Sequence, residues 1–376
     1  MNLRERFLAS CLNEPVDRLI NTEFFFWDET IQRWHQEGLP SELIYQPDAV
    51  SHRDPLIKQL GLDCNWLSQK FPVGMFEPDP LFEQVTLAED ADTRTLIDKR
   101  GITIQISRNM ASIPHYLDFP VKTRDDFEKV KWRYRSDTPE RYPADWDRLA
   151  QTEYRHRDYP MGLQMHGFYG QLREWMGFEN LSLAFYDQPE LISEMTAFWG
   201  DFLIATCQRA LETVTVDYVR FWEDMSYNAG MMCSPDIFRK FFTPHYGRVV
   251  EEFKSRGIRI LQVDSDGNVR DLIRVLKEVG INGMHPFERA AGNDLLALRE
   301  EHPDFLMIGG VDKRVIAKGK AAIRTEMEFI SRLAQQGNFI PHFDHGVPPD
   351  ISFENFRYYN ELKLRVLEQA ARRPNQ

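Results

Sequence analysis

The sequence predicts an α/β fold: one (β/α)8 TIM barrel domain over 1–376, with a small antiparallel β insertion in its N-terminal half. The second half alternates strand and helix about six times, which is typical of parallel strands joined by crossover helices. The length of 376 residues fits one barrel of this kind. A doubly wound open sheet is the alternative, and it is weakened because no glycine-rich phosphate loop follows an early strand.

The elements of the second half follow from hydrophobic periodicity. In the longest helix, Ile192, Met195 and Phe198 recur at helical spacing. Ser234 is of the N-cap type and precedes Pro235 at the first position of another helix. The expected strands are 159–167, 216–222, 258–263, 281–285, 305–310 and 338–343. The expected helices are 189–213, 235–256, 269–279, 293–302, 318–336 and 352–372.

The first half is less regular. A helix over 2–11 and a strand over 20–26 are clear, and residues 81–108 alternate between turn signals as an antiparallel excursion does. Residues 134–160 are polar and rich in Pro, Tyr and Arg, which predicts a surface connection. Core packing is the ordinary role of the aromatic residues here. The run "FFFW" is too continuous for a half-exposed strand, so some of its rings are candidates to line a pocket for a flat or apolar substrate.

Composition excludes several classes of protein. The formal net charge of -12 disfavours nucleic acid, because phosphate binding needs clustered Lys and Arg. Four scattered cysteines without a CxxC pair suggest neither a disulfide framework nor a zinc ribbon, and a reducing cytoplasm fits best. The N-terminus lacks an apolar signal core, and no apolar run approaches membrane-spanning length. We therefore expect a cytoplasmic protein with neither nucleic acid nor membrane partners.

Ionisable residues follow nearly every expected strand. Catalytic groups of a (β/α)8 barrel sit at the carboxyl ends of its strands, so this concentration favours a chemically active mouth. The residues at these ends are His166, Glu223, Asp224, Asp264, Asp266, His285, Glu288, Asp312, Lys313, His342, Asp344 and His345. Tyr169 and Trp222 adjoin the same ends and, with His166, His285 and His342, are candidates for substrate binding.

Each candidate also has a structural interpretation. Asp264 and Asp266 leave a strand on the same side, so they would share a proton or bind a cation, or they belong to an Asx turn that caps the next helix. His342 and His345 lie on opposite faces of an extended segment and converge only if the chain turns; a lone histidine is often structural. Glu223 would act as an acid, a base or a ligand, or it complements the dipole of helix 235–256.

Several segments resemble the uroporphyrinogen decarboxylase superfamily, which includes corrinoid-dependent methyltransferases. The resemblance runs through most of the chain and is firmest from about residue 159. The segments that carry it are "RERFLASCLNEPVDR", "WEDMSYNAGMMCSPDIFRKFFTPHYGRVVEEFKSRG", "LQVDSDGNVRDLI", "GGVDKRVIAKG" and "HFDHGVPPDISFENF". The resemblance implies a (β/α)8 barrel.

The two branches of this superfamily imply different chemistry. The decarboxylases use neither metal nor cofactor and carry an Arg-Gln-Ala-Gly-Arg motif, which this chain lacks; His345-Gly346-Val347-Pro348 looks like their His-Gly segment near the last strand. The methyltransferases commonly bind zinc through His-x-Cys-Gly and a later Cys. Asp264, Asp266 and His345 stand at the positions that resemble those ligands, so each soft ligand is replaced by a harder one.

These departures lead to one expected function and one alternative. A carboxylate–imidazole site suits zinc or another divalent metal acting on an oxygen, and without metal the same groups give general-acid help. We expect transfer of a methyl group from an O- or N-methyl small-molecule substrate to a corrinoid on a partner protein, since no Asp-x-His-x-x-Gly motif occurs here. The expected catalytic residues are His345, Asp264 and Glu223, and the expected metal ligands are Asp264, Asp266 and His345; the sequence allows a homodimer without fixing the oligomeric state. The alternative is cofactor-free decarboxylation of a tetrapyrrole or a smaller acid.

Overall fold

A six-stranded parallel sheet forms the centre of the computed structural model, which describes residues 1–46, 53–75, 77–108 and 114–372. The strand order is β14-β13-β12-β11-β8-β7, and every neighbouring pair is parallel. The strands are β7 (Gly162–His166), β8 (Tyr218–Trp222), β11 (Leu261–Ser265), β12 (Gly283–Pro286), β13 (Leu306–Ile308) and β14 (Phe339–Ile340). The α/β class and the parallel sheet are thus confirmed.

Two further strands form a separate small sheet next to the edges of the six-stranded sheet. Strands β1 (Thr22–Glu23) and β2 (Cys64–Asn65) pair in parallel. Isolated parallel bridges link Lys70 to Gly162 of β7, and Phe26 to Val347 beyond β14. The segments that follow β1 and β2 therefore each contact one edge of the six-stranded sheet.

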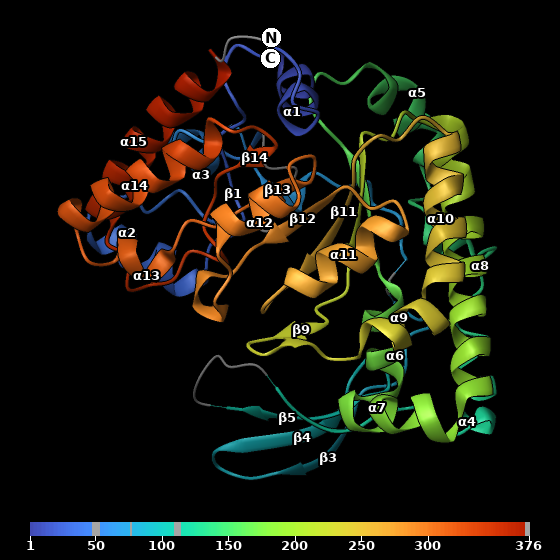
Figure 1. Ribbon diagram of the computed structural model, residues 1–376. Coiled ribbons are helices and arrows are strands. Elements are labelled where there is room, and N and C mark those ends of the chain that lie inside the picture. The colour runs from blue at the N-terminus through green and yellow to red at the C-terminus, as the bar shows by residue number, and fades with distance from the viewer. Residues whose placement is uncertain (47–52, 76, 109–113, 373–376) are drawn as a thin grey trace.

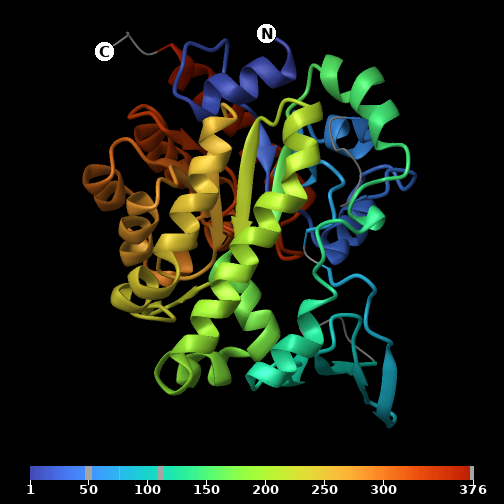
Figure 2. The same ribbon diagram turned by 90° about the vertical axis from the view of Figure 1, so that its right-hand side faces the viewer.

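Helices connect and cover the parallel strands. In Figure 1, α8 and α10 lie on one side of the sheet and α12 to α15 on the other, and Figure 2 shows the long α8 in front of the strands. The helices after β7 are α6 (Phe168–Met176), α7 (Phe178–Asp187), α8 (Pro189–Thr213), α9 (Pro235–Phe241), α10 (Thr243–Ser255), α11 (Arg270–Glu278), α12 (Leu295–Glu301), α13 (Lys313–Ile316), α14 (Lys320–Ala334) and α15 (Phe353–Ala371). Those before β7 are α1 (Leu3–Cys11), α2 (Asp28–Gln36), α3 (Pro55–Gln59), α4 (Arg124–Lys131) and α5 (Trp146–Thr152).

The strands separate two hydrophobic cores. On β8, Val219 and Phe221 belong to the large core shared with the helices, whereas Tyr218 joins a smaller inner cluster. That cluster also holds Phe24, Trp66 and residues of β13 and β14. Alternation along each strand thus sends one set of side chains to the helices and the other to the interior.

The expected antiparallel insertion is confirmed as a four-stranded sheet in the order β3-β4-β5-β6. Its strands are β3 (Val85–Glu89), β4 (Thr93–Ile97), β5 (Thr103–Ser107) and β6 (His115–Asp118), so the sheet extends beyond the expected range of 81–108. Figure 1 places β3, β4 and β5 at the end of the molecule opposite the two termini, next to α7. A short hairpin of β9 (Ser226–Tyr227) and β10 (Gly230–Met231) follows β8.

Candidate active site

A cavity of about 500 Å³ lies at the carboxyl ends of the parallel strands. Its lining is partly aromatic and apolar. The polar part consists of two histidines, one glutamine, one arginine and four carboxylic acids. Its lining consists of Phe24, Phe25, Leu67, Glu77, Gln164, Met165, His166, Arg220, Trp222, Asp224, Asp264, Asp266 and His345. Among the sequence candidates, it brings together His166, Trp222, Asp224, Asp264, Asp266 and His345.

Strand register arranges part of this lining in two layers. Arg220 of β8 is paired with Gln164 on one side and Gln262 on the other, which forms the deeper layer. Two residues further along each strand, Trp222 is paired with His166 and with Asp264. Asp264 is in turn paired with His285 of β12. The candidate strand-end residues thus occupy one level, with a guanidinium and two amides at the level below.

Asp264 is a protonatable carboxyl group at the cavity wall. Burial raises its pKa to about 7, and the charges of Asp266 and Asp224 add to this effect while Arg220 opposes it. The Nδ1 atom of His285 lies 3.8 Å from Oδ1 of Asp264, beyond hydrogen-bonding distance. Near neutral pH, Asp264 can therefore both donate and accept a proton.

The second proton donor at the cavity wall is His345, which is paired with Asp266. The His345 Nε2 atom lies 3.6 Å from Oδ2 of Asp266, and 26% of the His345 side chain is exposed. Burial lowers the pKa of His345, but the interaction with Asp266 outweighs it, and the net shift is upward. The chain therefore turns as required for His345 to face one of the two aspartates.

His285 and His342 lie behind the cavity lining, packed on Phe24. Both are fully buried, and the ring of His342 stacks on Phe24 at a centroid distance of 5.7 Å. The His285 ring meets the same phenyl ring edge-on at 5.1 Å. Burial lowers the pKa of His342 to about 3 and that of His285 well below its ordinary value. They are neutral supports of the aromatic wall in this arrangement, and substrate contact by either stays a prediction.

Glu223 and Tyr169 point away from the cavity. The Glu223 carboxylate accepts hydrogen bonds from the backbone N–H groups of Phe168 and Gly170, each at 2.8 Å, in the first turn of α6. Its dipole-complementing role therefore concerns α6 and not the helix over 235–256. Tyr169 is fully buried and belongs to the large core. Neither residue is among those that line the cavity, so the catalytic role of Glu223 and the substrate contact of Tyr169 stay predictions.

Arg220 is one of the cavity residues that sequence reasoning missed. It is 7% exposed, and its Nη2 atom donates to Oε1 of Gln164. A charged residue within the apolar strand "VDYVRFW" was itself a signal, since arginine is seldom buried without a specific partner. Polar residues at alternate positions in "LQMH" and "LQVD" gave the same signal for Gln164 and Gln262, because alternation marks one face of a strand.

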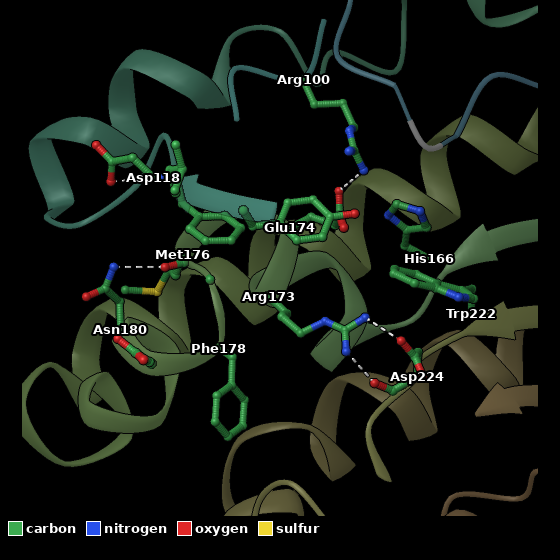
Figure 3. Close-up of a pocket in the computed structure, with 15 residues that line it drawn as sticks. Arg100, Asp118, His166, Arg173, Glu174, Met176, Phe178, Asn180, Trp222 and Asp224 are labelled. Atoms are coloured by element: carbon green, nitrogen blue, oxygen red, sulfur yellow. Dashed lines mark hydrogen bonds and ion pairs between the residues drawn. The ribbon is translucent and has the colours of Figure 1, made fainter. Parts of the chain in front are cut away.

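A wider groove of about 670 Å³ adjoins the cavity and shares His166, Trp222 and Asp224 with it. Figure 3 shows His166 beside Trp222 at one side of the groove, where their ring centroids lie 4.7 Å apart. Arg173 of α6 binds Asp224 at 2.9 Å and lies over the Trp222 ring at 5.1 Å. Asp224 has a φ of 41°, an uncommon backbone conformation for a residue other than glycine, and Arg173 holds its carboxylate.

The described residues do not fit a three-ligand metal centre. No group of three or more His, Cys, Asp or Glu side chains in this part of the chain has a suitable arrangement. Asp266 pairs with His345, whereas Asp264 lies within the electrostatic influence of Arg220, whose positive charge disfavours a cation there. Joint metal binding by Asp264, Asp266 and His345 stays a prediction, and we assign no catalytic step to a metal.

Across the described helices, none is both long and apolar enough to cross a membrane.

Comparison with solved structures shows a likeness in fold over nearly the whole chain. A methyltransferase from Methanosarcina mazei matches with a TM-score of 0.56 and 13% identity, covering 96% of this chain and 98% of that one. A putative vitamin-B12 independent methionine synthase from Listeria monocytogenes has a TM-score of 0.32 and 11% identity, covering 55% and 64% of the two chains. Xylanase B from Clostridium stercorarium has a TM-score of 0.30 and 14% identity, covering 61% and 86%.

The family is identified by sequence. No curated protein matches this chain. The model of the uroporphyrinogen decarboxylase (URO-D) family matches residues 96–362, which include β7 to β14 and every lining residue of the cavity beyond Glu77. The chain therefore belongs to the uroporphyrinogen decarboxylase family.

Proposed function

We propose that this protein is a methyltransferase-type member of its family, which removes a methyl group from an O- or N-methyl small molecule and passes it to a corrinoid on a partner protein. The observation that carries the proposal is the cavity wall, where Asp264 and the Asp266–His345 pair offer two proton donors at strand ends. The likeness in fold to the methyltransferase from Methanosarcina mazei supports it.

Proton donors are what cleavage of such a methyl group requires. When the bond between the methyl carbon and its oxygen or nitrogen breaks, the bonding electron pair stays on the heteroatom. Protonation of that heteroatom makes it a better leaving group. The raised pKa of His345 keeps its imidazolium form available near neutral pH, and Asp264 has a pKa of about 7. A corrinoid on the partner would supply the methyl acceptor, and no residue of this chain is assigned to hold it.

The fold that supports this site is, we infer, one closed (β/α)8 barrel in a single domain. The bridges Lys70–Gly162 and Phe26–Val347 support closure, because they join the β1–β2 pair to both edges of the six-stranded sheet. A cytoplasmic location is supported by Cys11, Cys64, Cys207 and Cys233, which are all free thiols.

The experiment is methyl transfer to free cob(I)alamin, followed by the absorbance of methylcobalamin, with a panel of methoxy and methylamine compounds. We expect transfer by the unmodified protein and a large loss in the His345→Gln variant, with Arg365→Met as an exposed control. Metal analysis of the same preparation tests the three-ligand prediction. Failure of every substrate with correctly folded protein would contradict the proposed function.

Decarboxylation is the second candidate, favoured by the protonatable Asp264 at the cavity wall. Loss of carbon dioxide leaves an electron pair on carbon, and Asp264 could supply the proton that replaces the carboxyl group. Release of carbon dioxide from uroporphyrinogen or a smaller acid, without any cobalamin requirement, would select this alternative.

A further inference from the structure

Arg220 places a buried positive charge at the inner end of the cavity. Only 7% of this residue is exposed, and it lines the cavity together with Gln164. Its Nη2 atom donates to Gln164, whereas its Nη1 atom has no hydrogen-bond partner among the described residues. Buried guanidinium N–H groups are ordinarily paired, so an unpaired one at a cavity wall indicates a place for an acceptor.

Behind the cavity lining, the neighbouring strand holds further polar atoms for which the described residues supply no partner. Gln262, the strand neighbour of Arg220, is fully buried, and neither its Oε1 nor its Nε2 atom has a partner in the described part of the chain. A carboxylate accepts two parallel hydrogen bonds from a guanidinium, which is the strongest pairing available to arginine. A compact carboxylate oxygen pair therefore matches this level of the cavity better than a neutral group does.

Neighbouring acidic groups do not neutralise Arg220 by direct contact. Asp224 is bound to Arg173 at 2.9 Å, and Asp266 faces His345 at 3.6 Å. No ion pair joins Arg220 to Asp264 in the described part of the chain, and the Nη2 atom of Arg220 donates to Gln164 instead. The guanidinium is thus the cationic group of the lining whose charge is left for a ligand.

The rest of the lining describes the body of that ligand. Phe24, Phe25 and Trp222 present aromatic rings to the cavity, and Leu67 adds apolar surface. Two strand residues separate the Arg220 level from the Asp264 level, roughly 6–7 Å along the strands and more to Asp266 and His345. A benzene ring with substituents at opposite ends spans about this interval.

We propose that the cavity binds a small aromatic carboxylate, with the carboxylate on Arg220 and the opposite substituent directed toward Asp264, Asp266 and His345. This inference rests on the proposed function in one respect, namely that this cavity is the substrate site. It adds the chemical class of the substrate and the direction in which it enters, carboxylate first.

Binding alone tests the inference, without cobalamin. The probes are 4-methoxybenzoate and its neutral isostere 4-methoxybenzamide, titrated calorimetrically at pH 7 and constant ionic strength. We expect the unmodified protein to bind the carboxylate about 10- to 100-fold more tightly than the amide, as a charge-assisted hydrogen bond in a buried site provides. Equal affinities for the two probes would overturn the inference.

Variants locate the preference. Arg220→Met should abolish it, Arg220→Lys should retain part of it, and Arg365→Met, at an exposed ion pair with Glu361, should leave it unchanged. Because loss of a buried arginine can prevent folding, Gln164→Glu is the second test: it gives Arg220 an internal carboxylate and should remove the preference in a folded protein. A preference that survives either folded variant overturns the inference.

The two proposals fail separately. A carboxylate preference without any methyl transfer would contradict the proposed function and leave this inference standing. Methyl transfer from neutral substrates, with no preference between the two probes, would support the proposed function and contradict this inference.

Discussion

At the scale of single residues, the site depends on how its neighbours set the protonation of two side chains. Asp266 counteracts the effect of burial on His345, and burial itself raises the pKa of Asp264. Each side chain is unremarkable in the sequence, where an aspartate at a strand end is also a turn residue. Their protonation depends on long-range contacts, which no local pattern encodes.

Asp266→Asn should lower the pKa of His345 below its ordinary value. Burial and the charge of Lys313 both lower this pKa, and Glu288 is the remaining group that raises it. If the imidazolium is the proton donor, the alkaline limb of the pH–rate profile should move to lower pH. Titration of the His345 imidazole by NMR measures the shift directly. Glu288→Gln is the matched control and should cause a smaller fall; an unchanged pKa in Asp266→Asn would contradict the assignment.

Asp264→Asn should stabilise the protein at neutral and alkaline pH. The pKa of Asp264 is about 7 in the folded state against an ordinary value of 3.8, so the folded state retains a proton that the unfolded state loses. The free energy of unfolding of the unmodified protein therefore falls as pH rises from about 4 to about 7 and then stays level. With 14% of this side chain exposed, we expect a gain of about 1–2 kcal/mol for the variant at pH 8 and little at pH 4. Urea unfolding at both values measures it, and an equal gain at both would contradict the stated cause.

Arg220 shows how much of the site was open to prediction from sequence. The strand ends were the right place for His166, Asp264, Asp266 and His345, because the carboxyl ends of parallel strands share one edge. The deeper layer was missed because only strand ends were considered. An arginine in mid-strand becomes a candidate once the inward-facing residues of β7, β8 and β11 are aligned, which needs the strand register.

At the scale of elements, long periodic segments were predictable and their interruptions were not. Helix α8 has the predicted bounds, Pro189–Thr213. The helix expected over 235–256 is instead α9 and α10, separated at Phe242. Pro244 in the first turn of α10 explains the break, because proline has no N–H group to continue the hydrogen bonds of a preceding helix. The Ser234 cap is confirmed by its hydrogen bond with the N–H of Ile237 at 3.2 Å.

Glu223→Gln should weaken the start of α6 more than it affects chemistry. One of the two N–H groups that now donate to the carboxylate would face an amide nitrogen, at a cost of about 1–3 kcal/mol in the free energy of unfolding. Chemical denaturation measures this, with Glu190→Gln in the exposed first turn of α8 as a matched control. If Glu223 is catalytic, the variant should instead lose most of its kcat while its stability stays unchanged.

At the scale of the whole molecule, the sequence predicted the alternation of strands and helices. It did not predict how residues 134–160 and the four-stranded sheet pack against the rest of the chain. Residues 134–160 were expected to be a surface connection, yet they include α5, where Trp146 is fully buried and donates to Oγ1 of Thr213 at 3.0 Å. That correction has a tertiary cause, since the indole is covered by a helix distant in sequence. The four-stranded sheet likewise meets α6 through Arg100 and forms one wall of the outer groove.

Arg100→Met should loosen the attachment of the four-stranded sheet without weakening the parallel strands. Arg100 pairs with Glu174 of α6 and with Asp98, so it joins the sheet to the helix that also carries Arg173. We expect faster amide hydrogen exchange over β3–β6 and weaker binding of ligands that occupy the groove, because the wall that contains Tyr116 and Phe119 becomes less fixed.

The matched control is Arg108→Met, which removes an ion pair with Glu89 that stays inside the sheet. Hydrogen exchange followed by mass spectrometry separates the two cases, since β7 and β8 should keep their protection in both variants. Faster exchange to the same extent in Arg108→Met would show that the sheet depends on its own ion pairs, and that its contact with α6 does not hold the groove in shape.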